Sequence, residues 1–213
     1  MNPIASFAHF FKSGGPYMYA ILGVGVVILA FVAERFWVIG RSAAFNAGKF
    51  TNDVVSRVAK GDVNGAAEMC RRIKNPVAAV AHAVITRADA DEDRMQNAAD
   101  GAAMVALPPL SRRLPYLNML ANVSTLLGLL GTIFGLITAF SAVDAADPAQ
   151  RSAFLAKGIS EALNTTAFGL IVAVPTLMLH GFLVSKVEAV VEAVDQTTVR
   201  LIDALSRRSA RAA

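Results

Sequence analysis

Three long apolar runs dominate the distribution of polar and apolar positions along the chain. The first covers residues 17–33, and the other two, 114–143 and 162–185, contain no Asp, Glu, Lys or Arg. A helix needs about 20 apolar residues to span the hydrocarbon core of a bilayer, so both later runs are long enough to cross it. The pattern predicts an all-α polytopic membrane protein with three transmembrane helices, of which the second and third extend into a cytoplasmic helical bundle.

The first run has the position of a secretory signal peptide but differs from one in detail. Only Lys12 offers a positive charge before it, the run is long, and charged and aromatic residues follow it directly. These features favour a retained transmembrane helix over a cleaved signal. Glu34 and Arg35, with Trp37 close by, are typical of an anchor at the membrane interface.

The orientation follows from the lysines and arginines of the connecting segments, because such residues are retained on the cytoplasmic side. One precedes the first span, eleven lie in residues 40–115, two in 144–157 and five in 186–213. The N-terminus is therefore expected outside and the C-terminus in the cytoplasm. The expected order is an external segment 1–15, transmembrane helix 16–39, cytoplasmic helical region 40–115, transmembrane helix 116–143, external loop 144–157, transmembrane helix 158–185 and cytoplasmic helical tail 186–213.

Local signals predict helices throughout the long cytoplasmic region. Residues that commonly cap the start of a helix occur at Asn52-Asp53 and at Gly61-Asp62, and Asn75-Pro76 is expected to break the second of these helices. An acidic cluster, Asp89, Asp91, Glu92 and Asp93, favours a further helix start, because the helix dipole stabilises carboxylates there. We interpret this cluster as a solvated helix start rather than a cation site.

Prolines and a spaced apolar seam complete the picture of the cytoplasmic parts. Pro108, Pro109 and Pro115 are expected to interrupt the approach to the second span. In the tail, spacings of three and four relate Val187, Val190, Val194, Thr197, Leu201 and Ala204. This spacing is typical of a helix that packs against other helices.

Composition agrees with a membrane protein and excludes several other classes. Hydrophobic residues make up 55% of the 213 residues, charged residues 17%, and the mean hydropathy is +0.50. The net charge of +4 is not gathered into a basic patch interleaved with aromatic residues, so nucleic acid is not an expected partner. The one cysteine, Cys70, has no partner for an intrachain disulfide or a CxxC motif. No nucleophile, phosphate-binding or metal-ligand motif is present, which predicts neither an enzyme nor a metal or cofactor site.

Small and hydroxyl residues recur at helical spacing in the two charge-free runs. In the second span the stripe consists of Thr125, Gly128, Thr132, Gly135 and Ala139, and in the third of Ala162, Thr166, Gly169, Ala173, Thr176 and His180. Such stripes allow two helices to approach closely, and packing alone is one interpretation. The other is that the hydroxyls line a hydrated path, because a polar group in hydrocarbon requires water or a partner.

Two strings carry a family resemblance: LLGLLGTIFGLITAF at 126–140 and EALNTTAFGLIVAVPTL at 161–177. They resemble the hallmark helices of the MotA/TolQ/ExbB proton-channel family, most closely its ExbB/TolQ branch. The pair Glu34-Arg35 and the three-helix layout extend the resemblance over the chain. Many relatives have Ala-Pro before the first string, whereas this chain has Ser124-Thr125, so the second span is expected to be less kinked.

The resemblance implies roles for particular residues. Thr132, Thr166, Thr165 and Glu161 would belong to an ion pathway. Positions for close helix packing would be Gly128, Gly131, Gly135, Gly169, Ala173 and Pro175. Neither charge-free run holds a carboxylate that could carry protons, so another chain must supply one. A threonine hydroxyl donates to a carboxylate and accepts from a carboxylic acid, and it therefore suits both states of that group.

The resemblance also implies an assembly in the bacterial inner membrane, with segments 1–15 and 144–157 in the periplasm. Five copies would surround the membrane helices of two copies of an ExbD/TolR/MotB-like protein that has a single span carrying an Asp. The expected function is the proton-channel subunit of an ion-driven motor that energises a TonB-like, TolA-like or gliding system. Three spans argue against a flagellar stator, and the driving ion is left open between proton and sodium. The alternative, from another class, is a passive oligomeric membrane scaffold without ion conduction.

Overall fold

The computed structural model describes residues 10–212 except 12 and 146, so parts of the predicted segment 1–15 lie outside the described residues. Within the described part, all regular secondary structure is helical. The chain divides into two compact units. We call them the transmembrane unit, Met1–Glu34 with Leu114–Gly181, and the bundle unit, Arg35–Arg113 with Phe182–Ala213.

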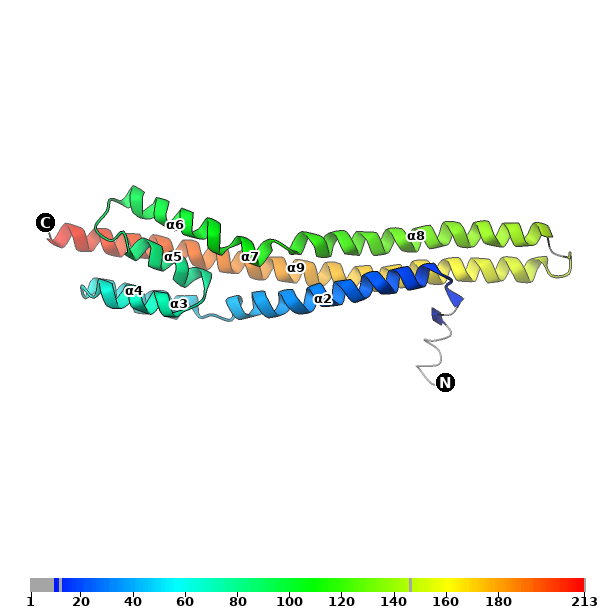
Figure 1. The fold of residues 1–213 in the computed structure, drawn as a ribbon, viewed down its shortest axis with the longest axis horizontal. Helices are drawn as coiled ribbons and strands as arrows, with labels where there is room; N and C mark the ends of the chain where they lie inside the picture. The colour runs from blue at the N-terminus through cyan, green and yellow to red at the C-terminus, as the bar shows by residue number, and fades with distance from the viewer. Residues whose placement is uncertain (1–9, 12, 146, 213) are drawn as a thin grey trace, which may run out of the picture. The chain divides into compact units, whose positions relative to one another are not determined.

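Three helices form the long elements of the chain: α2 (Tyr17–Ala43), α8 (Leu114–Ala145) and α9 (Arg151–Ala212), shown in Figure 1. Each contains a stretch long and apolar enough to cross a membrane. The prediction of an all-α protein with three spans is confirmed.

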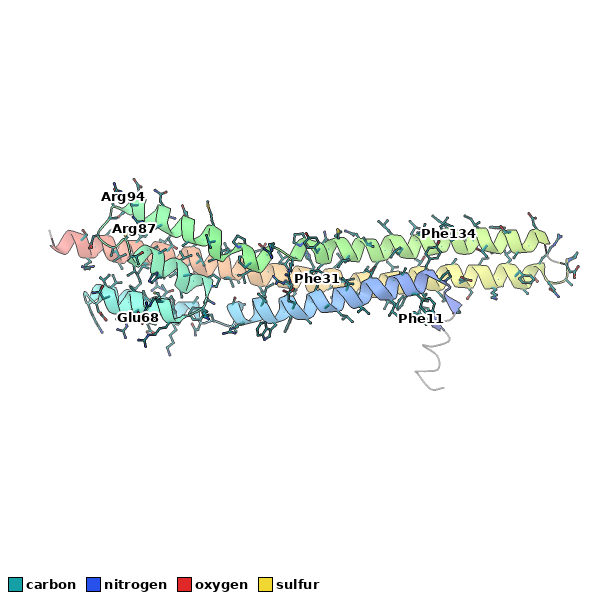
Figure 2. All side chains as sticks on the ribbon, viewed as in Figure 1. Phe11, Phe31, Glu68, Arg87, Arg94 and Phe134 are labelled. Atoms are coloured by element: carbon teal, nitrogen blue, oxygen red, sulfur yellow. The ribbon has the colours of Figure 1, made fainter. Side chains whose placement is uncertain are left out.

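In the transmembrane unit, aromatic and aliphatic side chains join α2 to the other two long helices. Met18 and Ile21 of α2 are buried with Phe168 of α9. Two stacked ring pairs join α2 to α8, Tyr17 with Phe134 at 5.3 Å between centroids and Phe31 with Tyr116 at 6.3 Å; Figure 2 labels Phe31 and Phe134.

The bundle unit consists of short helices packed on the C-terminal part of α9. They are α3 (Ala47–Ala59), α4 (Val63–Arg72), α5 (Pro76–Ile85), α6 (Glu92–Ala106) and α7 (Pro108–Ser111). Their apolar faces bury one core together with Val194, Leu201 and Leu205 of α9. The helix seam expected in the tail is therefore present within an unbroken helix.

Cys70 lies in this core and is 1% exposed. Burial raises the pKa of its thiol to about 11, because the thiolate would lose its hydration. The thiol is thus held in its neutral, unreactive form at physiological pH.

The start of α3 differs from the sequence prediction. Asn46 caps the helix by accepting from the Lys49 amide at 3.0 Å, and Phe45 packs on Phe50 at 5.3 Å between ring centroids. This cap and hydrophobic staple start the helix earlier than the predicted cap at Asn52 and Asp53. Those two residues lie inside the helix instead.

The predicted helix starts at Asp62 and at the acidic cluster are confirmed, and the predicted break at Asn75-Pro76 is itself the start of the next helix. Asp62 accepts from the Gly65 amide and Asp91 from the Arg94 amide, both at 2.9 Å. Asn75 accepts from the Val77 amide at 3.0 Å, with Pro76 at the first helical position. In each case a short polar side chain satisfies an amide that the helix leaves unpaired.

The predicted loop 144–157 is shorter than expected, and one of the predicted proline breaks before α8 is absent. Of the predicted loop 144–157, the residues from Arg151 onward are already helical, since a helix continues beyond its apolar stretch once its polar side chains reach water. Pro115 lies in the first turn of α8 and does not interrupt it, because the amide that proline lacks is unpaired there in any helix. Pro108 and Pro109 form the start of α7.

Candidate functional site

The backbones of α8 and α9 touch where glycines of the two helices meet. A Cβ added to Gly128 would lie 3.2 Å from the Cα of Thr166 and 3.4 Å from that of Gly169. A Cβ added to Gly169 would lie 2.8 Å from the Ser124 carbonyl oxygen. Side chains larger than hydrogen would therefore push the helices apart, as expected of small-residue packing in membranes.

Further along this crossing, Gly135 packs on Ala162, with only 3.0 Å between a Cβ added to the glycine and the alanine Cβ. Gly131 lies against the Thr165 side chain. Ala173 of the predicted set is also buried, whereas Pro175 lies within α9 at the exposed surface of this single chain.

The buried stripe of α8 is shifted from the predicted one. Ser124 is fully buried at the crossing, whereas Thr125 is exposed and its hydroxyl donates to its own helix at Ala121. The spacing of three from Thr125 to Gly128 and of four from Ser124 to Gly128 both fit a helix face. Only the contact of Ser124 with Gly169 in the structure shows that Ser124, and not Thr125, lies on the buried face.

The hydroxyls of Thr132 and Thr166 meet between α8 and α9. They are hydrogen-bonded to each other, and the Thr166 hydroxyl also lies 2.9 Å from the Gly128 carbonyl oxygen. The Thr132 hydroxyl lies 3.2 Å from the same carbonyl oxygen and 3.4 Å from that of Ala162. Both side chains are half-buried, so the pair sits at the edge of the helix crossing and not at its centre.

This pair has hydrogen-bonding capacity beyond its present contacts. Each hydroxyl carries one hydrogen and two lone pairs. The Gly128 carbonyl offers each hydroxyl an alternative acceptor to the other hydroxyl, so the two hydrogens can be redistributed without moving either helix. The two hydroxyls can therefore either donate a hydrogen bond to a group that approaches them or accept one from it.

Thr165 lies apart from this pair. It is 1% exposed, and its hydroxyl lies 2.5 Å from the Gly14 carbonyl oxygen and 2.9 Å from that of Glu161, so either can accept its hydrogen. One turn of α9 therefore directs Thr166 toward α8 and Thr165 toward the residues that precede α2.

The residues before α2 contact α9, and the sequence analysis did not predict this contact. Asn164 donates to the Ser13 hydroxyl at 2.9 Å, and the Phe11 and Phe168 rings meet edge to face at 5.7 Å; Figure 2 labels Phe11 beside the start of α2. The aromatic residues before the first apolar run are the signal that could have indicated it.

Glu161 packs on the turn that leads into α2. Gly15 has a φ of +71°, a conformation that favours glycine, and a Cβ there would collide with the Glu161 carboxylate. The side chain of Glu161 therefore lies directly on the Gly15 backbone. The sequence could not predict this contact, because the two residues are far apart along the chain.

Arg35 is buried in the bundle unit, with 5% of its surface exposed. Its Nη1 donates to the Pro109 carbonyl at 2.9 Å and approaches that of Leu110 at 3.5 Å. Trp37, by contrast, is 70% exposed. The role of Glu34 and Arg35 as an interfacial anchor stays a prediction, and the structure adds a connection from α2 to α7.

The exposed large side chains of the charge-free runs 114–143 in α8 and 162–185 in α9 are apolar. On α8 they include Leu126, Leu129, Leu130, Ile133, Phe134, Ile137 and Phe140, and on α9 Leu163, Leu170, Ile171, Val174, Leu177, Met178 and Phe182. Among the described residues, no group of three or more His, Cys, Asp or Glu is placed to hold a metal ion. The site thus consists of hydroxyls, glycine backbone and one carboxylate on an otherwise apolar pair of helices.

Comparison with known proteins gives consistent matches. The model of the MotA/TolQ/ExbB proton channel family matches residues 71–196. A putative biopolymer transport protein ExbB-like 3 of Synechocystis is 30% identical over 169 residues, which cover 78% of this chain and 79% of that protein. A putative ExbB homolog of Methanothermobacter thermautotrophicus is 25% identical over 92% of this chain and 70% of its own length. The Tol-Pal system protein TolQ of Haemophilus influenzae is 41% identical over 81 residues, 38% of this chain and 35% of that protein.

Proposed function

Because the chain belongs to the MotA/TolQ/ExbB proton channel family, in its ExbB/TolQ branch, we propose that it is the proton-channel subunit of an inner-membrane motor. In this proposal it is a channel subunit rather than an enzyme, and it uses the proton motive force to energise a periplasm-spanning system. The relatives named ExbB and TolQ support a TonB-like or a Tol-like system equally.

The hydroxyl pair Thr132–Thr166 is the observation that carries the proposal. It lies between two helices whose runs 114–143 and 162–185 hold no charged side chain, so a proton carrier must come from another chain. We propose that this carrier is an aspartate in the single span of an ExbD/TolR-like partner. The pair would donate to the aspartate when it is charged and accept from it when it is protonated.

We propose the assembly that the family resemblance implies. Five copies would surround two partner helices, with Thr132 and Thr166 turned to the partner and the apolar faces turned to lipid or to neighbouring copies. The N-terminus would be periplasmic and the C-terminus cytoplasmic, in line with the eleven Lys and Arg of residues 40–115. A proton that falls through about 100 mV releases roughly 2.3 kcal/mol, which can bias the position of packed helices.

Glu161 and Thr165 have a different place in this proposal. Thr165 is engaged by Gly14, and Glu161 lies on Gly15. We propose that both act at the periplasmic end of the pathway, where the segment before α2 holds them in position. Gly128, Gly131, Gly135 and Gly169 would keep α8 and α9 close enough for the hydroxyls to meet, whereas a packing role of Ala173 and Pro175 stays a prediction.

The test replaces single hydroxyls by methyl groups. Thr132→Val and Thr166→Val keep the side-chain shape and remove one hydrogen bond to a charged group, an interaction worth about 1.5–3 kcal/mol. Proton flux into liposomes that contain the chain and its partner should fall about tenfold or more. The mass of the complex should not change.

Thr138→Val is the matched control. Thr138 lies on α8, is exposed, and its hydroxyl donates to its own helix at Phe134, 2.8 Å away. This variant should conduct like the natural chain. Equal flux in all three variants would contradict the proposal and support a passive scaffold.

A further inference from the structure

The bundle unit contains a basic pocket of about 630 Å³ between the end of α3 and the last turns of α9. Lys60, Arg200, Arg207 and Arg208 line it, and Asp203 is the one acidic residue among the residues that line it. Its apolar floor includes Val55 and Ala59. Four cations around a shared hollow repel each other, so an anionic occupant would stabilise the arrangement.

Contacts within the chain leave most of this charge uncompensated. Arg207 forms an ion pair with Asp203 at 2.9 Å, whereas Arg200 donates to the neutral amide of Asn52 at 2.6 Å. Within the described residues, no ion pair joins Lys60 or Arg208 to a carboxylate. The pocket therefore presents about three positive charges to its surroundings.

The chain carries a segment of opposite charge in the same unit. Asp89, Asp91, Glu92 and Asp93, here called the acidic segment 89–93, are all exposed at the turn from α5 to α6. Arg87 and Arg94 flank the segment, and Figure 2 labels both. Arg94 lies 3.8 Å from Asp91, so the segment with its flanks keeps a net negative charge.

Among the described residues, no hydrogen bond or ion pair joins the acidic segment 89–93 to the cations of the pocket in the same chain. The segment and the pocket both lie at the end of the bundle unit where α9 ends, and α9 runs between them in Figure 1, with the α3–α4 turn on one side and the α5–α6 turn on the other. A neighbouring copy at the same level, however, can present its acidic segment to the pocket. A head-to-tail contact of this kind can repeat from copy to copy, and it forms a ring where the rotation between copies closes.

We propose that the basic pocket binds the acidic segment 89–93 of a second copy of this chain and so links neighbouring copies outside the membrane. The inference rests on the proposed function, because it requires several copies around one axis. It adds a polar contact that fixes which side of one copy faces the next. Complementary charge at an interface serves this purpose more than it adds affinity.

Carbodiimide cross-linking tests the contact directly, because it joins a lysine amine to a carboxylate that lies against it, with loss of water. The assembled complex is formed from equal amounts of ¹⁵N-labelled and unlabelled chain and then treated. A peptide that joins Lys60 to Asp89, Glu92 or Asp93 should appear, with mixed isotope labels in about half of the molecules. Lys60→Arg keeps the charge and removes the amine, so this peptide should vanish while the complex persists.

Charge reversal tests whether the contact matters for assembly. Lys60→Glu with Arg208→Glu, or Asp89→Lys with Glu92→Lys, places like charges at the contact. Each variant should weaken association of the copies about tenfold, as measured by dissociation of the purified complex on dilution. A chain with all four changes should regain most of the loss, since the charges are then exchanged. Lys49→Glu with Glu188→Lys, two exposed positions outside the pocket and the acidic segment, is the control and should have no effect.

The outcomes separate this inference from the proposed function. A cross-linked peptide that joins Lys60 to the partner protein, or that is found only within single chains, would overturn the inference. It would also be overturned if the chain with all four changes associated as weakly as expected from the sum of the two reversals. If the natural complex assembles and conducts protons in such a case, the proposed function stands alone. A natural chain that forms no oligomer would contradict both.

Discussion

Arg35 shows how one charged side chain is accommodated inside the bundle unit. It is buried, and its guanidinium donates to the Pro109 carbonyl at the start of α7. A hydrogen bond from a charged group contributes about 1.5–3 kcal/mol, and its loss leaves a partly buried carbonyl without this donor.

Arg35→Leu is therefore expected to lower the free energy of unfolding by about that amount. The measurement is thermal unfolding in detergent, followed by circular dichroism. Arg41→Leu on the same helix is the control, because Arg41 is exposed. An equal loss of stability in both variants would show that a positive charge near the helix end, and not the hydrogen bond to Pro109, stabilises the protein.

Individual side chains mark the limit of what the sequence could predict. The pattern placed Thr132 and Thr166 on small-residue faces, and their hydroxyls do meet. The same pattern could not place Thr165, because its partner is the backbone of Gly14, a residue that has no side chain and lies far away in the chain. A contact with the backbone of a distant residue cannot be predicted from the periodicity of hydrophobic side chains.

At the scale of elements, the contact between α8 and α9 depends on glycine. Gly169→Ala would place a Cβ 2.8 Å from the Ser124 carbonyl, and because backbone cannot move away as a side chain can, the helices must separate. Overpacking of this kind costs about 1–3 kcal/mol. The unfolding temperature in detergent should fall, and proton flux should fall with it, since Thr132 and Thr166 would move apart.

Gly181→Ala on the same helix is the matched control. A Cβ at Gly181 meets nothing within 4 Å, and alanine favours a helix over glycine by about 0.5–1 kcal/mol. This variant should be unchanged or slightly more stable. If both alanine variants behaved alike, close approach of the backbones would not be the reason for the glycines.

Helix existence was easier to predict than helix ends. The helix starts at Asp62 and at Asp91 were identified because each residue stands directly before a helix-forming stretch and has a side chain that can cap it. The start of α3 was missed because the staple between Phe45 and Phe50 sets it, and the polar pair Asn52-Asp53 offered a competing cap signal. Two local signals of similar strength cannot be ranked without the tertiary contact.

At the scale of the whole molecule, the chain is an integral membrane protein that lacks charge in two of its spans. If it is a channel subunit, it cannot move protons alone. Co-expression with a single-span partner should give a complex of five and two copies, as measured by native mass spectrometry.

Replacement of the partner's membrane aspartate by asparagine should leave the mass of this complex unchanged and abolish its proton flux. Asparagine has nearly the same size and hydrogen-bonding reach but cannot bind and release a proton at neutral pH. Flux that persists with asparagine would place the carrier elsewhere and contradict the division of roles between the two chains.

The sequence was sufficient for the fold class and the family, because long charge-free runs and the two strings 126–140 and 161–177 are both local features. It was not sufficient for the contacts of Phe11 and Ser13 with α9, which join an aromatic and a short polar side chain to residues far away in the sequence. The basic pocket is equally non-local, because Lys60 and Arg208 come together only when α3 packs on α9.

The burial of Cys70 makes the natural chain a background for site-directed spin labelling. It is the one thiol in the sequence, and within the folded protein it keeps its proton at neutral pH. A nitroxide reagent will therefore attach to any cysteine introduced at the surface and leave the native one unmodified. Electron-spin distances between labelled copies can then be compared in de-energised and energised vesicles without first replacing Cys70.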